Sequence, residues 1–128
     1  MIINRTLMLT FLIGSGLGAI GATAIVAQGR TPPAYFISEA TIKDADLYRK
    51  FLSMEPPNAD FGGHQLVRGG RVVAIKDEPA PAPRIAIVAF DSVEAAQRWV
   101  KLTGHVDAMK LYHQAADGHT FIVEGVAP

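Results

Sequence analysis

The feature that most constrains folding is a run from Leu7 to Ala27 that contains no charged side chain. About twenty apolar residues are enough for a helix to cross the hydrocarbon core of a membrane. Arg5 precedes the run, and small residues lie near its end, at 22–24 and at Ala27. This order is typical of an export signal. The sequence therefore predicts an apolar helix over residues 1–27, which serves as a signal peptide or as a membrane anchor.

Cleavage of this segment stays open. Secretory apolar cores usually span about 7 to 15 residues, which favours a retained anchor here, whereas the small residues favour cleavage. In both cases we expect the rest of the chain to be exported. It would be periplasmic, or anchored in the inner membrane with the domain outside the cytoplasm, and only residues 7–27 of an uncleaved chain would touch the membrane.

The hexapeptide GLGAIG, residues 16–21, matches the pattern G-x-G-x-x-G of dinucleotide-binding loops. That pattern binds a dinucleotide only where a strand ends and a helix begins within a βαβ unit. Here the glycines lie inside the uncharged run, and glycine is common in membrane helices. We therefore expect no cofactor.

The rest of the chain is long enough for one small domain, which we place at residues 34–126 after a linker at 28–33. The sequence holds 12 basic and 12 acidic side chains and no basic stripe, so nucleic acid is not an expected partner. It contains no cysteine, which excludes thiol catalysis and thiolate metal sites.

Apolar periodicity and capping residues predict the elements of this domain. Asp44 and Ser92 are the expected N-caps of two helices, Gly104 is expected to precede a third, and Gly69-Gly70 is typical of a hairpin turn. The expected strands are 34–42, 64–68, 72–76, 84–90 and 119–126, and the expected helices are 44–54, 92–102 and 105–116. The result is an α+β fold, a ferredoxin-like β-α-β-β-α-β sandwich with an extra β-hairpin.

The strand RIAIVAF, residues 84–90, is apolar at both alternating sets of positions. A strand with one wet face should alternate apolar and polar residues, so this one is expected to be buried on both faces. The helices can cover only one face. The simplest cover for the other is the same sheet of a second copy, which predicts a two-fold homodimer.

Three stretches carry a resemblance to a known family: PPNADFGGHQLVRGG, PAPRIAIVAFDSVEAAQRW and FIVEGV. They resemble the family called domain of unknown function 1330, within the dimeric α/β-barrel superfamily, over nearly all of residues 34–126. The resemblance implies a ferredoxin-like fold that pairs into a barrel, and it implies no settled activity. This chain departs from the family at His64, where relatives usually carry Arg or Lys.

His64 and Arg68 are the candidate catalytic residues. They lie four positions apart on an expected strand, which would place them on the same face. A neutral imidazole could take a proton while the guanidinium holds an anionic or enolate oxygen. The alternative is that Arg68 forms an ion pair at a strand end and His64 lies at the barrel rim.

Arg84, Glu39 and Trp99 are the candidate ligand-binding residues. Arg84 begins a strand and could join an anion site, or it could be a solvated strand end. Glu39 could equally form an ion pair with an arginine, and Trp99 fits a buried helix stripe. We expect no metal, because the spacing of His105 and His113 does not aim two imidazoles at one ion.

Two functional hypotheses remain. The first is an exported dimeric barrel that binds a small anionic or carbonyl compound. In its stronger form, this hypothesis adds that the barrel converts the compound without a cofactor. The second is a non-catalytic module of the cell envelope, anchored by its apolar segment, that has a structural or ligand-holding role. An enclosed pocket that holds charged side chains favours the first, whereas a cavity filled by apolar side chains favours the second.

Overall fold

A computed structural model describes residues 29–76 and 80–128 of the chain. The predicted signal peptide or anchor at 1–27, and with it the apolar helix, lies outside the described residues. Among the residues that are described, no helix is both long enough and apolar enough to span a membrane.

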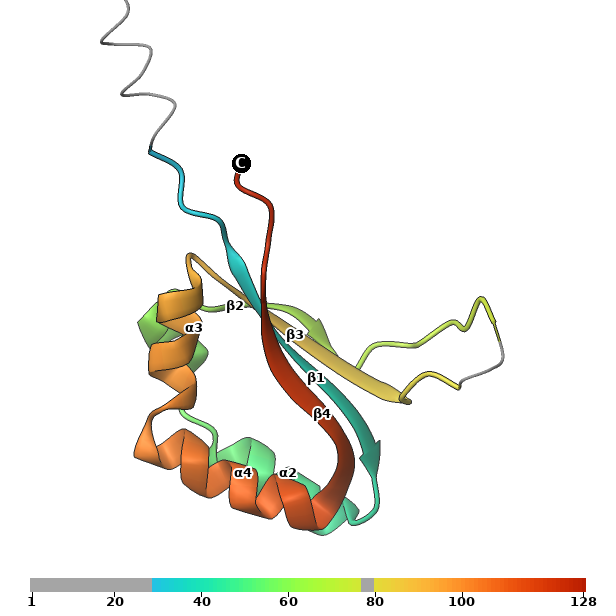
Figure 1. Cartoon of the computed structure of the whole chain (residues 1–128). Helices are drawn as coiled ribbons and strands as arrows, with labels where there is room; N and C mark the ends of the chain where they lie inside the picture. The colour runs from blue at the N-terminus through green and yellow to red at the C-terminus, as the bar shows by residue number, and fades with distance from the viewer. Residues whose placement is uncertain (1–28, 77–79) are drawn as a thin grey trace, which may run out of the picture. The chain divides into compact units, whose positions relative to one another are not determined.

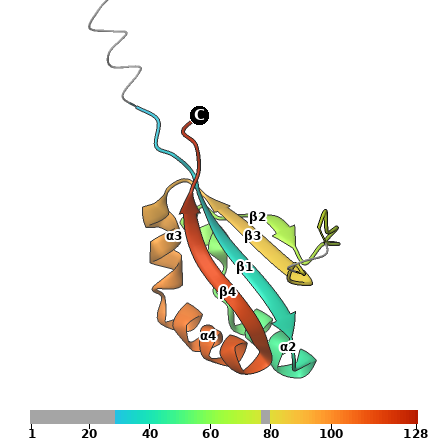
Figure 2. The ribbon, with the colours of Figure 1, turned by 45° about the vertical axis from the view of Figure 1, so that its right-hand side comes forward.

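The chain forms one four-stranded antiparallel sheet with three α-helices on one side of it (Figures 1 and 2). The elements are β1 (Ala34–Ile42), α2 (Ala45–Met54), the short 3-10 helix η1 (Asn58–Phe61), β2 (His64–Arg68), β3 (Arg84–Phe90), α3 (Val93–Val100), α4 (Thr103–Ala115) and β4 (Ala116–Glu124). The strand order is β2-β3-β1-β4. This order and connectivity confirm the predicted α+β, ferredoxin-like β-α-β-β-α-β arrangement.

The predicted hairpin at Gly69-Gly70 is wrong. Residues 72–76 form no strand, and β2 pairs instead with β3, to which the N–H of Gly69 adds a 2.8 Å bond at Ile85 O. Gly69 has a positive φ of 61°, but Gly70 does not, so the tight primed turn is not formed. Of the apolar residues of the expected strand, Val73, Ala74 and Ile75 are exposed, Ile75 fully so, and Val72 is half-buried.

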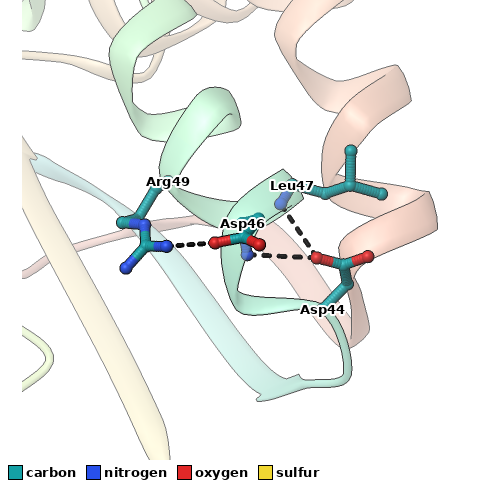
Figure 3. Close-up of polar contacts among 4 residues, drawn as sticks. All are labelled: Asp44, Asp46, Leu47 and Arg49. Carbon is teal, nitrogen blue, oxygen red and sulfur yellow. Dashed lines mark hydrogen bonds and ion pairs between the residues drawn. The ribbon is translucent and has the colours of Figure 1, made fainter.

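The two predicted helix caps are confirmed. The Asp44 carboxylate accepts 3.0 Å hydrogen bonds from the backbone N–H groups of Asp46 and Leu47 (Figure 3). The Ser92 hydroxyl accepts one of 3.1 Å from Ala95 N. These bonds satisfy amide groups that have no partner inside the first turn of a helix. Gly104, predicted to precede the third helix, lies instead in the first turn of α4.

The two faces of the sheet differ in what covers them. On β1, Ala34, Phe36, Ser38 and Ala40 are buried and form part of the helix-covered face, because alternate side chains point to one side. The other set of positions forms the open face. Its larger apolar members on β3, β1 and β4 are Tyr35, Ile37, Ile85, Ile87, Phe121 and Val123, which pair across these strands. They are exposed or half-buried in the single chain.

Candidate ligand-binding site

A cavity of about 240 Å³ lies between the helix-covered face of the sheet and the helices. Its walls combine apolar side chains with charged and polar ones. The apolar lining includes Phe36, Phe51, Val88, Trp99 and Met109, and the polar lining consists of Ser38, Tyr48, Glu55, Asn58, Gln65, Arg68, Arg84 and Thr120. From here on it is called the main cavity.

The main cavity exists because one row across the sheet has short side chains at its centre. Arg68 pairs with Ala86, Ala86 with Ser38, and Ser38 with Thr120, so the row crosses all four strands on the helix-covered face. Alanine, serine and threonine are too short to reach the helices, and a space that is lined by polar groups can hold water or a ligand.

Arg84 enters the main cavity from the first residue of β3 and is held by a tyrosine. Its Nε donates a 2.9 Å hydrogen bond to the Tyr48 hydroxyl, and its Cζ lies 5.2 Å from the centre of the Tyr48 ring. Both contacts fix the guanidinium in place. Arg68, which is exposed, lines the same cavity from the end of β2, so two positive side chains reach one small space.

Glu55 brings a carboxyl group to the same space. It follows directly after α2, and its side chain is only 23% exposed. Burial raises the pKa of Glu55 from its ordinary value of 4.5 to about 7, an effect that the positive charge of Arg68 partly offsets. Glu55 therefore exchanges a proton near neutral pH, as a general acid or base must.

Trp99 forms part of the wall and orders the segment next to Glu55. Its indole N–H donates a 2.9 Å hydrogen bond to Pro56 O, which lies 43 positions earlier. Its ring also packs edge-on against Phe36, with ring centres 5.2 Å apart. Trp99 is 2% exposed, so it belongs to the core as well as to the cavity wall.

The premise that His64 and Arg68 share a face is wrong. The pairing of β2 with β3 slips between Gln65 and Val67, which places a β-bulge near Leu66. His64 pairs with Ala89 on the open face, whereas Arg68 pairs with Ala86 on the helix-covered face. His64 is thus separated from the main cavity by the sheet itself.

Glu39 also lies on the open face, where its cross-strand neighbours are Ile85 and His119. Within the described chain its carboxylate makes no ion pair, and it is the backbone carbonyl that accepts a 3.1 Å hydrogen bond from the Tyr112 hydroxyl. The structure therefore brings together Arg68, Arg84 and Trp99 of the five predicted site residues, and it keeps His64 and Glu39 apart from them.

Sequence reasoning missed Glu55 and Tyr48. Tyr48 lies on the buried face of α2, and its hydroxyl accepts the hydrogen bond from Arg84. Glu55 carried only a weak signal: an acid directly before two prolines at a helix end. Among the described residues no group of three or more His, Asp or Glu side chains could hold a metal ion.

Comparison with known proteins supports this fold. The model of the family described as domain of unknown function (DUF1330) matches residues 33–126. The structure of the RPA0582 protein of unknown function from Rhodopseudomonas palustris is similar, with a TM-score of 0.60 and 18% identity over 83% of this chain and 92% of that one.

Two further structures share the fold. The methylated form of the RPA0582 protein gives a TM-score of 0.61 with 16% identity over 83% of this chain and 90% of that one. A protein from Arabidopsis thaliana gives 0.50 with 16% identity over 74% of this chain and 94% of that one. None of the curated protein sequences matches this chain.

Proposed function

Because the chain belongs to the family called domain of unknown function 1330, whose name records no reaction, we propose a function from its own side chains. It binds a small anionic or carbonyl compound in the main cavity and converts it, without a cofactor, by moving a proton. The proposal is supported above all by one observation: two guanidinium groups and a carboxyl group with a pKa of about 7 line the same small space.

The roles follow from the chemistry of the three groups. Arg68 and Arg84 would hold a carboxylate or carbonyl oxygen of the ligand, because a guanidinium donates charge-assisted hydrogen bonds to such oxygens. Glu55 would take a proton from the carbon next to the carbonyl. The negative charge that then develops on the oxygen is stabilised by the same arginines.

We also propose that the protein acts as a homodimer that covers the open face. The apolar residues of this face form one continuous patch over three strands, and such a patch usually marks an interface. A second copy of the same sheet is complementary to it by two-fold symmetry. The dimer would hide Ile87 and Phe121 from water and leave the main cavity on the outside of the paired sheets.

Export of the domain is part of the proposal and is supported by the uncharged run from Leu7 to Ala27. It can be tested with a reporter enzyme, such as alkaline phosphatase, that is active only outside the cytoplasm. Fused after Pro128, the reporter should be active, and deletion of residues 7–27 should abolish its activity. An inactive fusion of the intact chain would contradict export.

The proposed function is tested with two probes and the full-length chain. Benzoate tests anion binding, and phenylpyruvate tests proton removal, since its benzylic C–H lies next to a carbonyl. We expect NMR shift changes at Arg84 and Trp99 on addition of either probe, and protein-dependent loss of the benzylic proton signal in D₂O. Binding without exchange would favour the ligand-holding module, and no binding of either probe would refute the site.

A further inference from the structure

A second hollow of about 470 Å³ lies beside the main cavity, between α4 and β4. It is lined mainly by apolar residues with a basic group at the rim: Phe36, Val100, His105, Val106, Met109, Lys110, His113, Thr120, Phe121 and Ile122. Phe36, Met109 and Thr120 line both spaces, so these residues form the common wall. Val106 and Lys110 are exposed, so the second hollow opens to solvent.

His105 lies in this wall and is nearly fully buried, with 3% of its surface exposed. Its ring packs against Trp99, at 4.3 Å between ring centres, and against Phe36 at 5.9 Å. Its Nδ1 atom is buried and has no hydrogen-bond partner, which is costly for a polar atom and calls for an explanation. The Glu55 carboxyl lies close by, with Oε1 4.0 Å from Nδ1.

We propose that His105 is a positioning residue that relays protons: its Nδ1 accepts the proton that Glu55 has taken from the ligand, and the ring releases it to solvent through the second hollow. The inference rests on the proposed function of the main cavity. The geometry supports it in two ways. The unpartnered Nδ1 of His105 lies next to the Glu55 carboxyl, and the residue lines the second hollow, which opens to solvent.

Each step of the relay balances. The ionised carboxylate of Glu55 takes a proton from a ligand C–H bond, and the electron pair stays on the ligand as an enolate. Protonated Glu55 then gives this proton to Nδ1 of neutral His105 and becomes a carboxylate again. The imidazolium loses a proton to water in the second hollow, so the net change is one proton moved from ligand to solvent.

The protonation states make the transfer uphill and the release downhill. Burial lowers the pKa of His105, so the neutral imidazole can accept a proton, and it raises the pKa of Glu55 to about 7, so both forms of the carboxyl are present near neutral pH. The imidazolium is the stronger acid of the two, so its loss of a proton to water in the second hollow drives the relay forward. The 4.0 Å gap is longer than a hydrogen bond, and a side-chain shift of about 1 Å or one bridging water closes it.

Other charged or titratable groups around the pair come from two elements, β2 and α4. Arg68 of β2 acts on Glu55, while Lys110 and His113 of α4 line the second hollow. Lys110 is engaged by Asp107 at 3.1 Å, so its charge is partly compensated. Within the described residues Glu55 forms no ion pair with any of these groups, and Nδ1 of His105 is the basic atom found within 4.0 Å of its carboxyl.

The relay is tested first without ligand, by ¹³C and ¹⁵N NMR of the full-length chain over a pH series. In the wild type, the Nδ1 resonance of His105 should show a step at the midpoint of the Glu55 carboxyl titration. In His105→Phe, which keeps the aromatic packing, the Glu55 midpoint should fall by about half a pH unit because the protonated carboxyl loses Nδ1 as its acceptor. His113→Phe, a matched change on the same helix and hollow, should leave it unchanged.

The second test follows loss of the benzylic proton of phenylpyruvate. We expect His105→Ala to slow it about tenfold, imidazole in solution to restore it, and His113→Ala to do neither. The relay would be overturned if the Nδ1 resonance of His105 did not change when Glu55 titrates, or if His105→Ala exchanged the benzylic proton at the wild-type rate. The proposed function would stand in both cases. Absence of exchange in the wild type would overturn the proposed function, and the ligand-free titration would still decide whether Glu55 and His105 share a proton.

Discussion

Nε of Arg84 donates a 2.9 Å hydrogen bond to the hydroxyl of Tyr48, a residue 36 positions earlier in the chain. The bond joins the start of β3 to the buried side of α2. It therefore links the guanidinium proposed to bind the ligand to the helix that Glu55 directly follows. The position of the Arg84 guanidinium in the main cavity therefore depends on the packing of α2, which carries Tyr48.

This link makes Arg84 more sensitive to substitution than an ordinary surface arginine. A charge-assisted hydrogen bond contributes about 1.5–3 kcal/mol, so Arg84→Met should weaken benzoate binding roughly 10- to 100-fold. Tyr48→Phe should weaken it only a few-fold, because the guanidinium stays but is less well fixed. Isothermal titration calorimetry measures both. Arg98→Met, on the exposed side of α3, is the control, and an equal loss there would indicate a general charge effect.

The buried carboxyl of Glu55 predicts a pH-dependent stability. Since its pKa is raised from 4.5 to about 7 in the folded chain, its contribution to stability is full below pH 4.5 and is lost as the pH rises through 7. The loss amounts to about 3 kcal/mol. Glu55→Gln, which cannot ionise, should be nearly neutral at pH 4 and should raise the free energy of unfolding at pH 8 by about this amount.

Urea unfolding of Glu55→Gln and wild type at pH 4, 6 and 8 checks this prediction. Comparing the two chains cancels the opposite contribution of His105, whose lowered pKa makes stability fall as the pH drops below 6.5. Glu124→Gln, on the exposed end of β4, tests whether loss of any carboxylate has the same effect. If the difference in free energy of unfolding between the wild type and Glu55→Gln does not change with pH, the Glu55 carboxyl is not buried.

Local rules predicted much of the fold, since caps and apolar periodicity are short-range signals. Asp44 and Ser92 accept bonds from amides within three positions, so their roles could be inferred from neighbouring residues alone. The hairpin prediction failed because residues 64–68 had two possible partners. The strand 84–90, far along the chain, was chosen over 72–76, and no local pattern reveals that choice.

The candidate site was predicted only in part for the same reason. A β-bulge at Leu66 reverses the faces of the residues that follow, which separates His64 from Arg68 although both lie on one strand. The burial of Glu55 depends on a long-range contact, since Trp99 holds the adjacent Pro56 by a hydrogen bond across 43 positions. Sequence spacing carries no information on either effect.

The N-cap of α2 should contribute measurably to stability. Asp44→Ala removes the acceptor for two backbone amides and should lower the free energy of unfolding by about 1 kcal/mol. Asp107→Ala, which removes only the exposed ion pair with Lys110, should cost less than about 0.5 kcal/mol. Thermal unfolding followed by circular dichroism distinguishes the two, and equal effects would contradict the capping role.

Gly118 is required where β4 pairs with Ala40 of β1. A Cβ atom at this position would overlap the backbone carbonyl oxygen of Glu39 and come within 2.9 Å of the Tyr112 hydroxyl that binds that oxygen. Backbone cannot move aside as a side chain can, so Gly118→Ala should cost roughly 3 kcal/mol or prevent folding. Gly70→Ala, where a Cβ has open space, should change stability by less than about 0.5 kcal/mol.

The proposed homodimer makes the open face sensitive to charge. Ile87 lies on the open face of β3, paired with Ile37 of β1, and a two-fold axis would place each substitution in the interface twice. Ile87→Lys should therefore convert the dimer to a monomer in sedimentation velocity experiments, because a buried lysine without a partner is strongly unfavourable. Ile75→Lys, in the fully exposed loop, should leave the dimer intact. If Ile75→Lys dissociates the protein and Ile87→Lys does not, the interface is formed by the loop and the open face has another role.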